Sequence, residues 1–158
     1  MSRAPSIRDA TPADEAVLLE FLHALQEAER VLCPSRRPGH EVDRLCYRQL
    51  LESGVQVLLA EEAEQAIGFV AGKLAVDGDE LQQAAWRPHG HISDLYVVPA
   101  WRGRGAARLL LEAMSSRLRT MGAKRLRIAV LSVNQAAIKT YRRFGFEPFR
   151  MSLDLDLV

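Results

Sequence analysis

The chain has 158 residues, of which 48% are hydrophobic and 26% charged, and its formal net charge is +1. This length and composition predict one soluble globular domain, residues 1–158, with a single core. The near-neutral charge gives no support for a nucleic-acid or membrane partner. No apolar run approaches the roughly 18 residues of a transmembrane helix.

Two further features bear on where the chain resides. Its start, MSRAPSIRDA, lacks the apolar segment of a secretory signal peptide. Cys33 and Cys46 have no second pair beside them, which is typical of a reduced, intracellular chain rather than of a disulfide framework or a zinc site. We therefore expect a cytoplasmic protein that holds no metal.

The first half of the chain predicts a strand, two helices and a hairpin. SIRD is typical of a short strand, after which Thr11 suits a helix N-cap, with Pro12 next and Asp14 completing a capping box. The apolar residues that follow recur at helical spacing. A second helix covers roughly 41–52 and ends at Gly54. VQVLLAEE and QAIGFVAGKLAV then predict two strands joined by a tight polar turn.

The second half alternates strands and helices. DGDELQQAAWRPHGH predicts a long polar loop, and ISDLYVV predicts a strand that Pro99 stops. A helix with one apolar face follows and is closed by Gly122. RLRIAVL predicts a strand, and NQAAIKTYRRF a helix that Gly145 ends. FEPFRMSLDLDLV predicts one or two final strands, in which polar residues alternate with Met151, Leu153, Leu155 and Leu157.

The resulting order of elements is β-α-α-β-β-β-α-β-α-β-β. This order predicts the α/β (α+β) class, a mixed sheet with helices on its faces. Strands and helices interleave most clearly over residues 91–146, where a βαβ unit is the natural arrangement.

A basic, glycine-bearing turn, RGRGAA, separates the ISDLYVV strand from its helix. It matches no Walker A loop, and a Rossmann fingerprint would need a third glycine where Arg108 stands. The first turn of a helix binds anions through unpaired N–H groups, and Gly103 and Gly105 let the backbone approach a phosphate closely. Arg102 and Arg104 add positive charge. A plain turn with solvated arginines explains this stretch, taken alone, equally well.

The same residues carry a resemblance to a known family. Arg102-x-x-Gly105-x-Ala107 matches the R/Q-x-x-G-x-G/A pattern of the GNAT acetyltransferase superfamily, departing only where Ala106-Ala107 replace the commoner Ile-Gly. DLYVVPAWRGRGAARLLLEAM resembles the family's motif A, NQAAIKTYRRFGFEPF its motif B, and SIRDATPADEAVLLEFL its opening strand and helix. The resemblance implies a single N-acetyltransferase domain with a mostly antiparallel central sheet, helices on both faces, and acetyl-CoA as cosubstrate.

The resemblance also implies which residues hold the cosubstrate. A backbone N–H of the strand before the turn polarises the thioester carbonyl, and this strand is often bulged so that a donor is free. Asn134 suits a helix N-cap, and by resemblance its side chain contacts the pantetheine arm. The expected cosubstrate-binding residues are Leu95, Tyr96, Val97, Arg102, Gly103, Arg104, Gly105, Ala106, Ala107 and Asn134.

Two residues are candidates for the chemistry. By resemblance Tyr141 is the general acid that protonates the departing thiolate, although it shares a helical face with Phe144 and also suits a core aromatic. Asp94 is the candidate general base, because burial in a covered strand would raise its pKa. A salt bridge or a sheet-end position explains Asp94 equally well, and His89, His91 or a chain of waters could take the role of base. The H-x-H pair lacks a third ligand, so we expect no metal.

The acceptor is the least determined part. By resemblance its pocket is lined by the first helix, the connection after it, and the loop before the ISDLYVV strand. If the arginines of these segments line a pocket, they favour an acceptor with a carboxylate or phosphate. The residues concerned are Glu29, Arg30, Arg36, Arg37, Trp86 and Arg87.

Several activities remain open at this point. The leading expectation is acetyl transfer from acetyl-CoA to a primary amine of a small molecule, an amino acid derivative or a peptide. The alternatives are a transferase for larger acyl groups and a catalytically idle domain that binds coenzyme A or interacts with another protein. A net charge of +1 gives little support to acetylation of aminoacyl-tRNA. The default partner for the apolar face of the alternating C-terminal strand is the chain's own core. A second subunit could also pair with the free edge of this strand or cover nearby strands, and we expect a homodimer.

Overall fold

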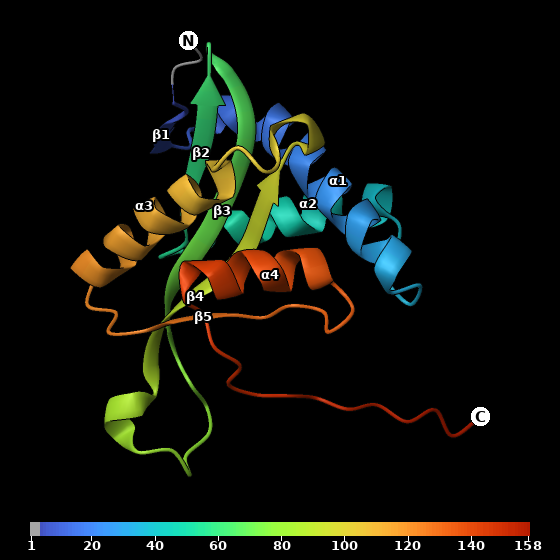
Figure 1. Ribbon diagram of the computed structural model, residues 1–158, viewed down its shortest axis with the longest axis vertical. Coiled ribbons are helices and arrows are strands. Elements are labelled where there is room, and N and C mark those ends of the chain that lie inside the picture. Colours follow the sequence, from blue (N-terminus) through green and yellow to red (C-terminus); the bar gives the residue numbers. More distant parts are fainter. Residues whose placement is uncertain (1–3) are drawn as a thin grey trace.

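The fold is that of one five-stranded sheet in the order β1-β2-β3-β4-β5, in a computed structural model that describes residues 4–158 (Figure 1). Neighbouring strands are antiparallel except β4 and β5, which are parallel. In chain order the elements are β1 Ser6–Asp9, η1 Pro12–Asp14, α1 Glu15–Leu32, α2 Gly39–Leu50, β2 Gln56–Glu62, β3 Gln65–Val76, η2 Ala84–Trp86, β4 Pro88–Val97, η3 Pro99–Trp101, α3 Ala106–Thr120, β5 Leu126–Ile128 and α4 Gln135–Phe144.

Helices cover both faces of the sheet, as predicted. On one face α1 and α2 enclose a cluster that includes Phe21, Phe69 and Tyr96, with the Phe21 and Tyr96 ring centroids 5.3 Å apart. On the other face α3 and α4 cover a second cluster built around Leu110 and Met114. Figure 1 shows α3 and α4 together on the same side of the sheet. Within residues 4–158, no helix is both long and apolar enough to cross a membrane.

Local signals in the sequence set several boundaries correctly. The Thr11 N–H donates to the Asp14 carboxylate at 2.7 Å, which confirms the capping box. The turn between β2 and β3 is tight because two of its residues adopt positive φ, 49° and 66°. Gly122 and Gly145 follow α3 and α4 with φ of 107° and 118°, so each glycine ends its helix as expected.

Two strands differ in length from the prediction. β4 begins at Pro88, not at Ile92, because β3 continues to Val76 and pairs there with Pro88. A proline is tolerated as the first residue of a strand, since it has no N–H to contribute to the ladder. β5 is only three residues long, because it pairs with β4 over a short stretch and then turns away.

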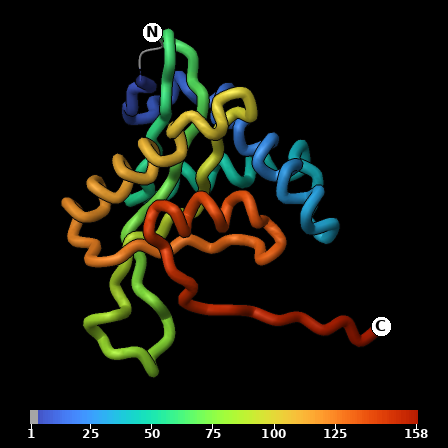
Figure 2. Tube along the Cα trace, viewed as in Figure 1, coloured from blue at the N-terminus to red at the C-terminus, as the bar shows by residue number. Residues whose placement is uncertain are grey.

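The final strands expected in FEPFRMSLDLDLV are not formed, so this part of the prediction is wrong for the single chain. After α4 the chain runs out in an extended path and ends away from the rest of the fold (Figure 2). A strand requires a partner for its backbone groups, and residues 145–158 pair with no strand of the described chain.

Candidate active site

The sheet opens where β4 and β5 separate. β5 pairs only with Gly90, His91 and Ile92 of β4. Beyond Ile92 the β5 side of β4 has no strand beside it in the described part of the chain, whereas the other side stays paired with β3 as far as Val97. This open edge presents a row of backbone N–H and C=O groups to whatever enters the gap.

The backbone of β4 directs particular N–H groups into this gap. The Val97 carbonyl accepts a hydrogen bond from Arg102 Nε at 2.9 Å, whereas the Val98 N–H donates toward β3. Successive residues of a strand direct their backbone groups to opposite sides. The N–H groups of Leu95 and Val97 therefore face the gap, and that of Tyr96 faces β3. Of the three expected backbone donors, Leu95 and Val97 are placed to meet a ligand.

A β-bulge sits just before Asp94. Ala71 pairs with Asp94 and the next residue of β3 pairs with Ile92, so Ser93 is an extra residue in β4. The bulge at Ser93 thus lies earlier in β4 than Leu95, Tyr96 and Val97, the residues of the expected carbonyl-polarising segment. A bulge inverts the alternation of side chains. Ile92 and Leu95 both pack into the cluster under α3, and Asp94 is turned to the opposite face, where α1 lies.

The turn that follows β4, residues 102–107, has the backbone of an anion site, and we call it the phosphate loop. Gly103 and Gly105 have φ of 73° and 89°, which favour glycine. Gly105 is the N-cap of α3 and offers no side chain to its first turn, so the N–H groups there are available to a ligand. Arg104 lies 4.9 Å from the Trp101 ring centroid, beside the loop. Ala106 is buried, so its contribution is limited to its backbone.

Asp94 and four residues from other parts of the chain form a group that we call the Asp94 cluster. Burial raises the pKa of the Asp94 carboxyl above its ordinary value, against the opposing effects of a Ser93 hydrogen bond and of His91. Burial likewise raises the pKa of the Glu29 carboxyl. The charge of Arg36 partly offsets this increase, and the charge of Asp94 adds to it. The members of the cluster are Glu29 of α1, Arg36, Cys46 of α2, Asp94 of β4 and Tyr141 of α4.

Tyr141 is the member of the cluster that α4 contributes. Burial, together with the smaller effects of the charges of Glu29 and Asp94, raises the pKa of Tyr141 to about 12. The phenol therefore keeps its proton at neutral pH. Its ring meets Phe146 edge-on, with centroids 5.9 Å apart, so the hydroxyl is held on a packed ring. Both interpretations of the sequence, the core aromatic and the group beside the site, fit this one position.

Asn134 caps α4, as predicted from its position. Its side-chain oxygen accepts a hydrogen bond from the Ala137 N–H at 3.2 Å. Tyr141 follows seven residues later, about two helical turns, and so lies on the same side of α4. The cap thus fixes the start of the helix that presents Tyr141.

Three of the four arginines expected near the acceptor form ion pairs with glutamates. This weakens the case for an acceptor carrying a carboxylate or phosphate. The guanidinium–carboxylate pairs are Arg30 with Glu27 at 2.9 Å, Arg36 with Glu29 at 2.6 Å and Arg37 with Glu41 at 3.1 Å.

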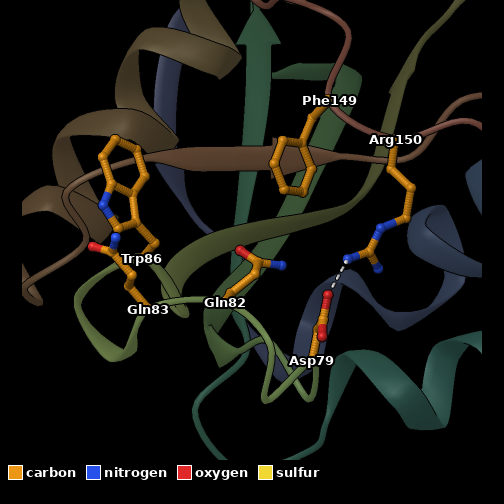
Figure 3. A pocket seen from close by; sticks show the side chains of 6 residues that line it. All are labelled: Asp79, Gln82, Gln83, Trp86, Phe149 and Arg150. Carbon is orange, nitrogen blue, oxygen red and sulfur yellow. Dashed lines mark ion pairs between the residues drawn. The ribbon is translucent and has the colours of Figure 1, made fainter.

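Trp86 and Arg87 do not belong to the Asp94 cluster. They lie in the loop that projects beyond the sheet (Figure 1), six or more residues along the strand from Asp94, or about 20 Å. Trp86 packs under Arg125 at 3.9 Å and lines a separate hollow of about 440 Å³ with the start of the C-terminal segment (Figure 3). These two residues therefore lie apart from the Asp94 cluster, and their place in the acceptor pocket stays a prediction.

The two histidines differ in their availability. His89 is buried, and its Nδ1 lies 2.9 Å from the Arg87 carbonyl. His91 is half-buried, and burial and the neighbouring His89 lower its pKa, which keeps it neutral. The charge of Asp94 acts on His91, so this imidazole remains a neighbour of the cluster.

Known proteins resemble this chain along most of its length. The model of the acetyltransferase (GNAT) family matches residues 20–146. Streptothricin acetyltransferase from Streptomyces lavendulae is 34% identical over 90 residues, which cover 54% of this chain and 48% of that protein. Aminoglycoside N(6')-acetyltransferase type 1 from Stenotrophomonas maltophilia is 29% identical over 161 residues, covering 98% and 97% of the two chains. The structure of aminoglycoside N-acetyltransferase AAC(6')-Iy in complex with CoA shares the fold, with a TM-score of 0.71 and 20% identity over 99% of this chain and 95% of that chain.

Proposed function

The chain belongs to the GNAT family of acetyltransferases, and from that premise we propose that it transfers the acetyl group of acetyl-CoA directly to a primary amine of a small molecule. One observation carries the proposal. Along β4 and the turn after it, the carboxyl of Asp94, the gap-facing N–H groups of Leu95 and Val97, and the free N-terminus of α3 follow one another in order. A base, carbonyl donors and a phosphate site are then aligned along one strand edge.

Binding of the cosubstrate follows from this alignment. The pyrophosphate would lie on the N–H groups of the phosphate loop, where the dipole of α3 adds favourable potential. From there the pantetheine arm runs along the open edge of β4 as an additional strand would, and hydrogen-bonds its exposed backbone groups. The thioester carbonyl then meets the N–H of Leu95 or Val97 in the gap.

The acceptor amine must lose its proton before it can attack. An ordinary alkyl ammonium has a pKa near 10.4, so it is almost wholly charged at neutral pH. Asp94, with its raised pKa, can accept that proton, directly or through a water. The neutral nitrogen attacks the carbonyl carbon, a C–N bond forms, and the negative charge on oxygen rests against the β4 N–H donor.

Collapse of this intermediate breaks the C–S bond and releases the coenzyme A thiolate. Tyr141 donates a hydrogen bond to the sulfur and supplies a proton as the charge develops. Because the pKa of Tyr141 is about 12, complete transfer of its proton to a thiolate whose conjugate acid has an ordinary pKa is unfavourable by roughly three orders of magnitude. The transfer is therefore concerted with uptake of a proton from solvent. The nitrogen of the intermediate loses its second proton to solvent as the C–S bond breaks, and the products are the acetamide and free coenzyme A.

The charges of the cluster favour a cationic acceptor. Glu29 and Asp94 bring two carboxyls to the site, and only Glu29 has an arginine partner there, Arg36. An ammonium group entering this region would stabilise the charged form of both carboxyls, whose pKa values burial raises, and would offset the charge of Asp94 that acts on Glu29. The relatives named for aminoglycosides and streptothricin act on molecules with several amino groups, which accords with this preference.

Release of free thiol from acetyl-CoA tests the proposal. The protein is offered a panel of diamines, aminoglycosides, amino acids and short peptides, and thiol is followed with a chromogenic disulfide. Release above the amine-free background with polyamines is expected, together with a mass gain of one acetyl group on the acceptor. Propionyl- and succinyl-CoA are run beside acetyl-CoA to test the preference for a small acyl group. Coenzyme A binding by calorimetry without thiol release for any amine would leave a binding domain and overturn the proposal.

A further inference from the structure

Arg102 contacts the open edge of β4 at the point where the cosubstrate is expected to lie. Its Nε donates a hydrogen bond to the Val97 carbonyl at 2.9 Å. The next residue along, Val98, donates its N–H to the Ile67 carbonyl of β3. Because successive residues of a strand direct their backbone groups to opposite sides, the Val97 carbonyl points away from β3 and into the gap. The arginine therefore covers one of the backbone groups that the open edge offers.

A tight turn brings Arg102 back beside the strand. Pro99 has no N–H with which to continue the ladder, and it opens the short helix η3. The Trp101 N–H donates to the Val98 carbonyl at 2.8 Å, and the Arg102 N–H donates to the Pro99 carbonyl at 3.2 Å. This reversal, between β4 and α3 in Figure 1, places the first side chain of the phosphate loop next to the end of β4.

The contacts that hold Arg102 in this place are weak. The residue is exposed, and its guanidinium carbon lies 5.7 Å from the Tyr96 ring centroid, where an exposed cation–π contact contributes little. Its hydrogen-bond acceptor, the Val97 carbonyl, is neutral. A pyrophosphate on the loop is an anion that a guanidinium can bind with two parallel hydrogen bonds, so it is the stronger partner.

The contact between Arg102 and Val97 and the expected path of the pantetheine arm exclude each other. An arm that runs beside β4 as an added strand would place an amide N–H about 2.9 Å from the Val97 oxygen. The Nε of Arg102 already lies at that distance. Because the carbonyl points into the gap, the guanidinium joined to Nε lies in the gap too. It must leave before the arm can bond to this carbonyl.

We propose that Arg102 is a positioning residue that couples the two ends of the cosubstrate. It covers the Val97 carbonyl until a pyrophosphate occupies the phosphate loop, then moves to the phosphate and exposes the carbonyl to the pantetheine arm. The inference rests on the proposed function, because it takes coenzyme A as the ligand, and it adds an order in which the ligand is recognised. A thioester without a pyrophosphate has to displace the arginine unaided, so the site discriminates against it.

Two thioesters distinguish this coupling from simple attraction of charge. Acetyl-CoA carries a pyrophosphate and acetyl-pantetheine does not. Arg102→Met removes the guanidinium and keeps a long side chain. KM for acetyl-CoA should increase about three- to tenfold, because phosphate loses a charged partner. KM for acetyl-pantetheine should decrease by a similar factor, because no hydrogen bond to Val97 has to be broken first. The kcat for either thioester should stay nearly constant, and a melting curve confirms the fold.

Arg104→Met is the matched control. Arg104 belongs to the same loop and carries the same charge, but its guanidinium lies 4.9 Å from the Trp101 ring centroid. Its replacement should increase KM for acetyl-CoA and leave KM for acetyl-pantetheine unchanged. Arg102→Lys keeps a charge and a donor, so both of its KM values should lie closer to those of the wild-type protein than the values of Arg102→Met do.

Nuclear magnetic resonance follows the arginine directly. The Nε–H signal of Arg102 is assigned as the one that is missing from the spectrum of Arg102→Met. Titration with ADP, which carries a pyrophosphate and no pantetheine arm, should shift this signal, and calorimetry measures ADP binding in parallel. Movement of the signal on ADP binding, together with opposite changes in the two KM values, is the expected result.

Two kinds of failure are distinguishable. If the Nε–H signal of Arg102 does not move when ADP binds, or if Arg102→Met brings no gain with acetyl-pantetheine, the coupling is overturned while coenzyme A remains the ligand. A folded wild-type protein that binds neither ADP nor acetyl-CoA would overturn the proposed function and this inference with it.

Discussion

The phosphate loop and the Asp94 cluster lie close together along one strand, yet they are built in opposite ways. The loop is made of backbone: two glycines at positive φ and the uncapped first turn of α3. The cluster is made of side chains contributed by α1, α2, β4, α4 and a connection. One site depends on conformation and the other on the placement of charge.

This difference predicts what each region tolerates. A backbone site keeps its ligand when nearby side chains change but fails when a residue forbids its φ and ψ. A side-chain cluster holds its groups at some expense in stability, because its carboxyls are buried without full compensation. Substitutions in the loop should therefore change affinity for the cosubstrate, and substitutions in the cluster should change turnover or acceptor preference.

The largest effect is expected at Tyr141. Tyr141→Phe removes one hydroxyl and leaves the ring packed on Phe146. Loss of a general acid costs about 10²–10⁴-fold in rate, so kcat should fall by that factor while KM for acetyl-CoA stays nearly constant. All acceptors should be affected alike, because the leaving group is common to them.

A matched control separates this effect from loss of packing. Tyr47→Phe changes another half-buried tyrosine, which belongs to α2 and packs against the cluster that α1 and α2 enclose. It should leave kcat unchanged, and the melting temperatures of the two variants should be similar. Full turnover by a folded Tyr141→Phe protein, with chemistry shown to limit the rate, would reduce Tyr141 to a core aromatic.

Asp94→Asn should lower kcat/KM by about 10²-fold or more and yet make the protein more stable at pH 7. Because the pKa of Asp94 is raised in the folded state, the folded protein binds more protons than the unfolded one as pH rises from about 4. Wild-type stability therefore falls with rising pH through the folded pKa, and the asparagine removes that loss. In the wild-type protein, kcat/KM should fall at low pH as Asp94 becomes protonated. This fall should be absent from the pH profile of the Asp94→Asn variant.

The carboxyl of Asp14 should change the stability of the protein with pH in the opposite direction to that of Asp94. Hydrogen bonds from Arg8 hold the pKa of the Asp14 carboxyl far below its usual range. Its contribution to stability is present at neutral pH and is lost as pH falls through that lowered pKa. Asp14→Asn should therefore lower the melting temperature at pH 7, where Asp94→Asn raises it. A fall for both variants would show that Asp94 is a stabilising carboxylate and contradict its assignment as a base.

Gly105→Val should weaken coenzyme A binding by about 10- to 100-fold, the loss of one or two hydrogen bonds to a charged phosphate. A Cβ at Gly105 would meet no heavy atom within 4 Å, so the damage comes from φ of 89° and from the space the ligand needs. Gly122→Val is the control, because this glycine also has positive φ, 107°, and open surroundings, at the other end of α3. Both should melt at a lower temperature, and calorimetry should find weakened binding only for Gly105→Val.

How far the sequence could predict these two regions follows from their construction. The phosphate loop is a contiguous stretch, so its glycines and the following helix could be recognised together, and the structure gives Gly103 and Gly105 the positive φ that the argument required. Asn134 was likewise predictable, because a helix cap depends only on neighbouring residues.

The Asp94 cluster could not be predicted in the same way. Cys46 gave no signal, because nothing in its neighbours along the chain places it near Asp94. The bulge at Ser93 decides which face Asp94 occupies, and a single extra residue in a strand has no reliable mark in the sequence. The prediction of strands in FEPFRMSLDLDLV failed for a related reason: the alternation can be recognised in the sequence, but a strand forms only where a partner edge is present.

The smallest expected effect concerns Arg36, and it tests which charge the acceptor carries. Arg36 and Glu29 form an ion pair of 2.6 Å with side chains 37% and 26% exposed. Partly exposed pairs of this kind contribute little, so Arg36→Gln should alter KM by only about two- to fivefold. Removing the guanidinium leaves the carboxyls of Glu29 and Asp94 less compensated, so KM for a diamine should decrease. KM for an otherwise similar amine that carries a carboxylate should increase, and KM for acetyl-CoA should not change. Arg37→Gln, which breaks the more exposed pair with Glu41, should change none of these. An increase in KM for the diamine together with unchanged folding would mean that Arg36 binds an anionic group of the acceptor, and the preference for a cationic acceptor would have to be abandoned.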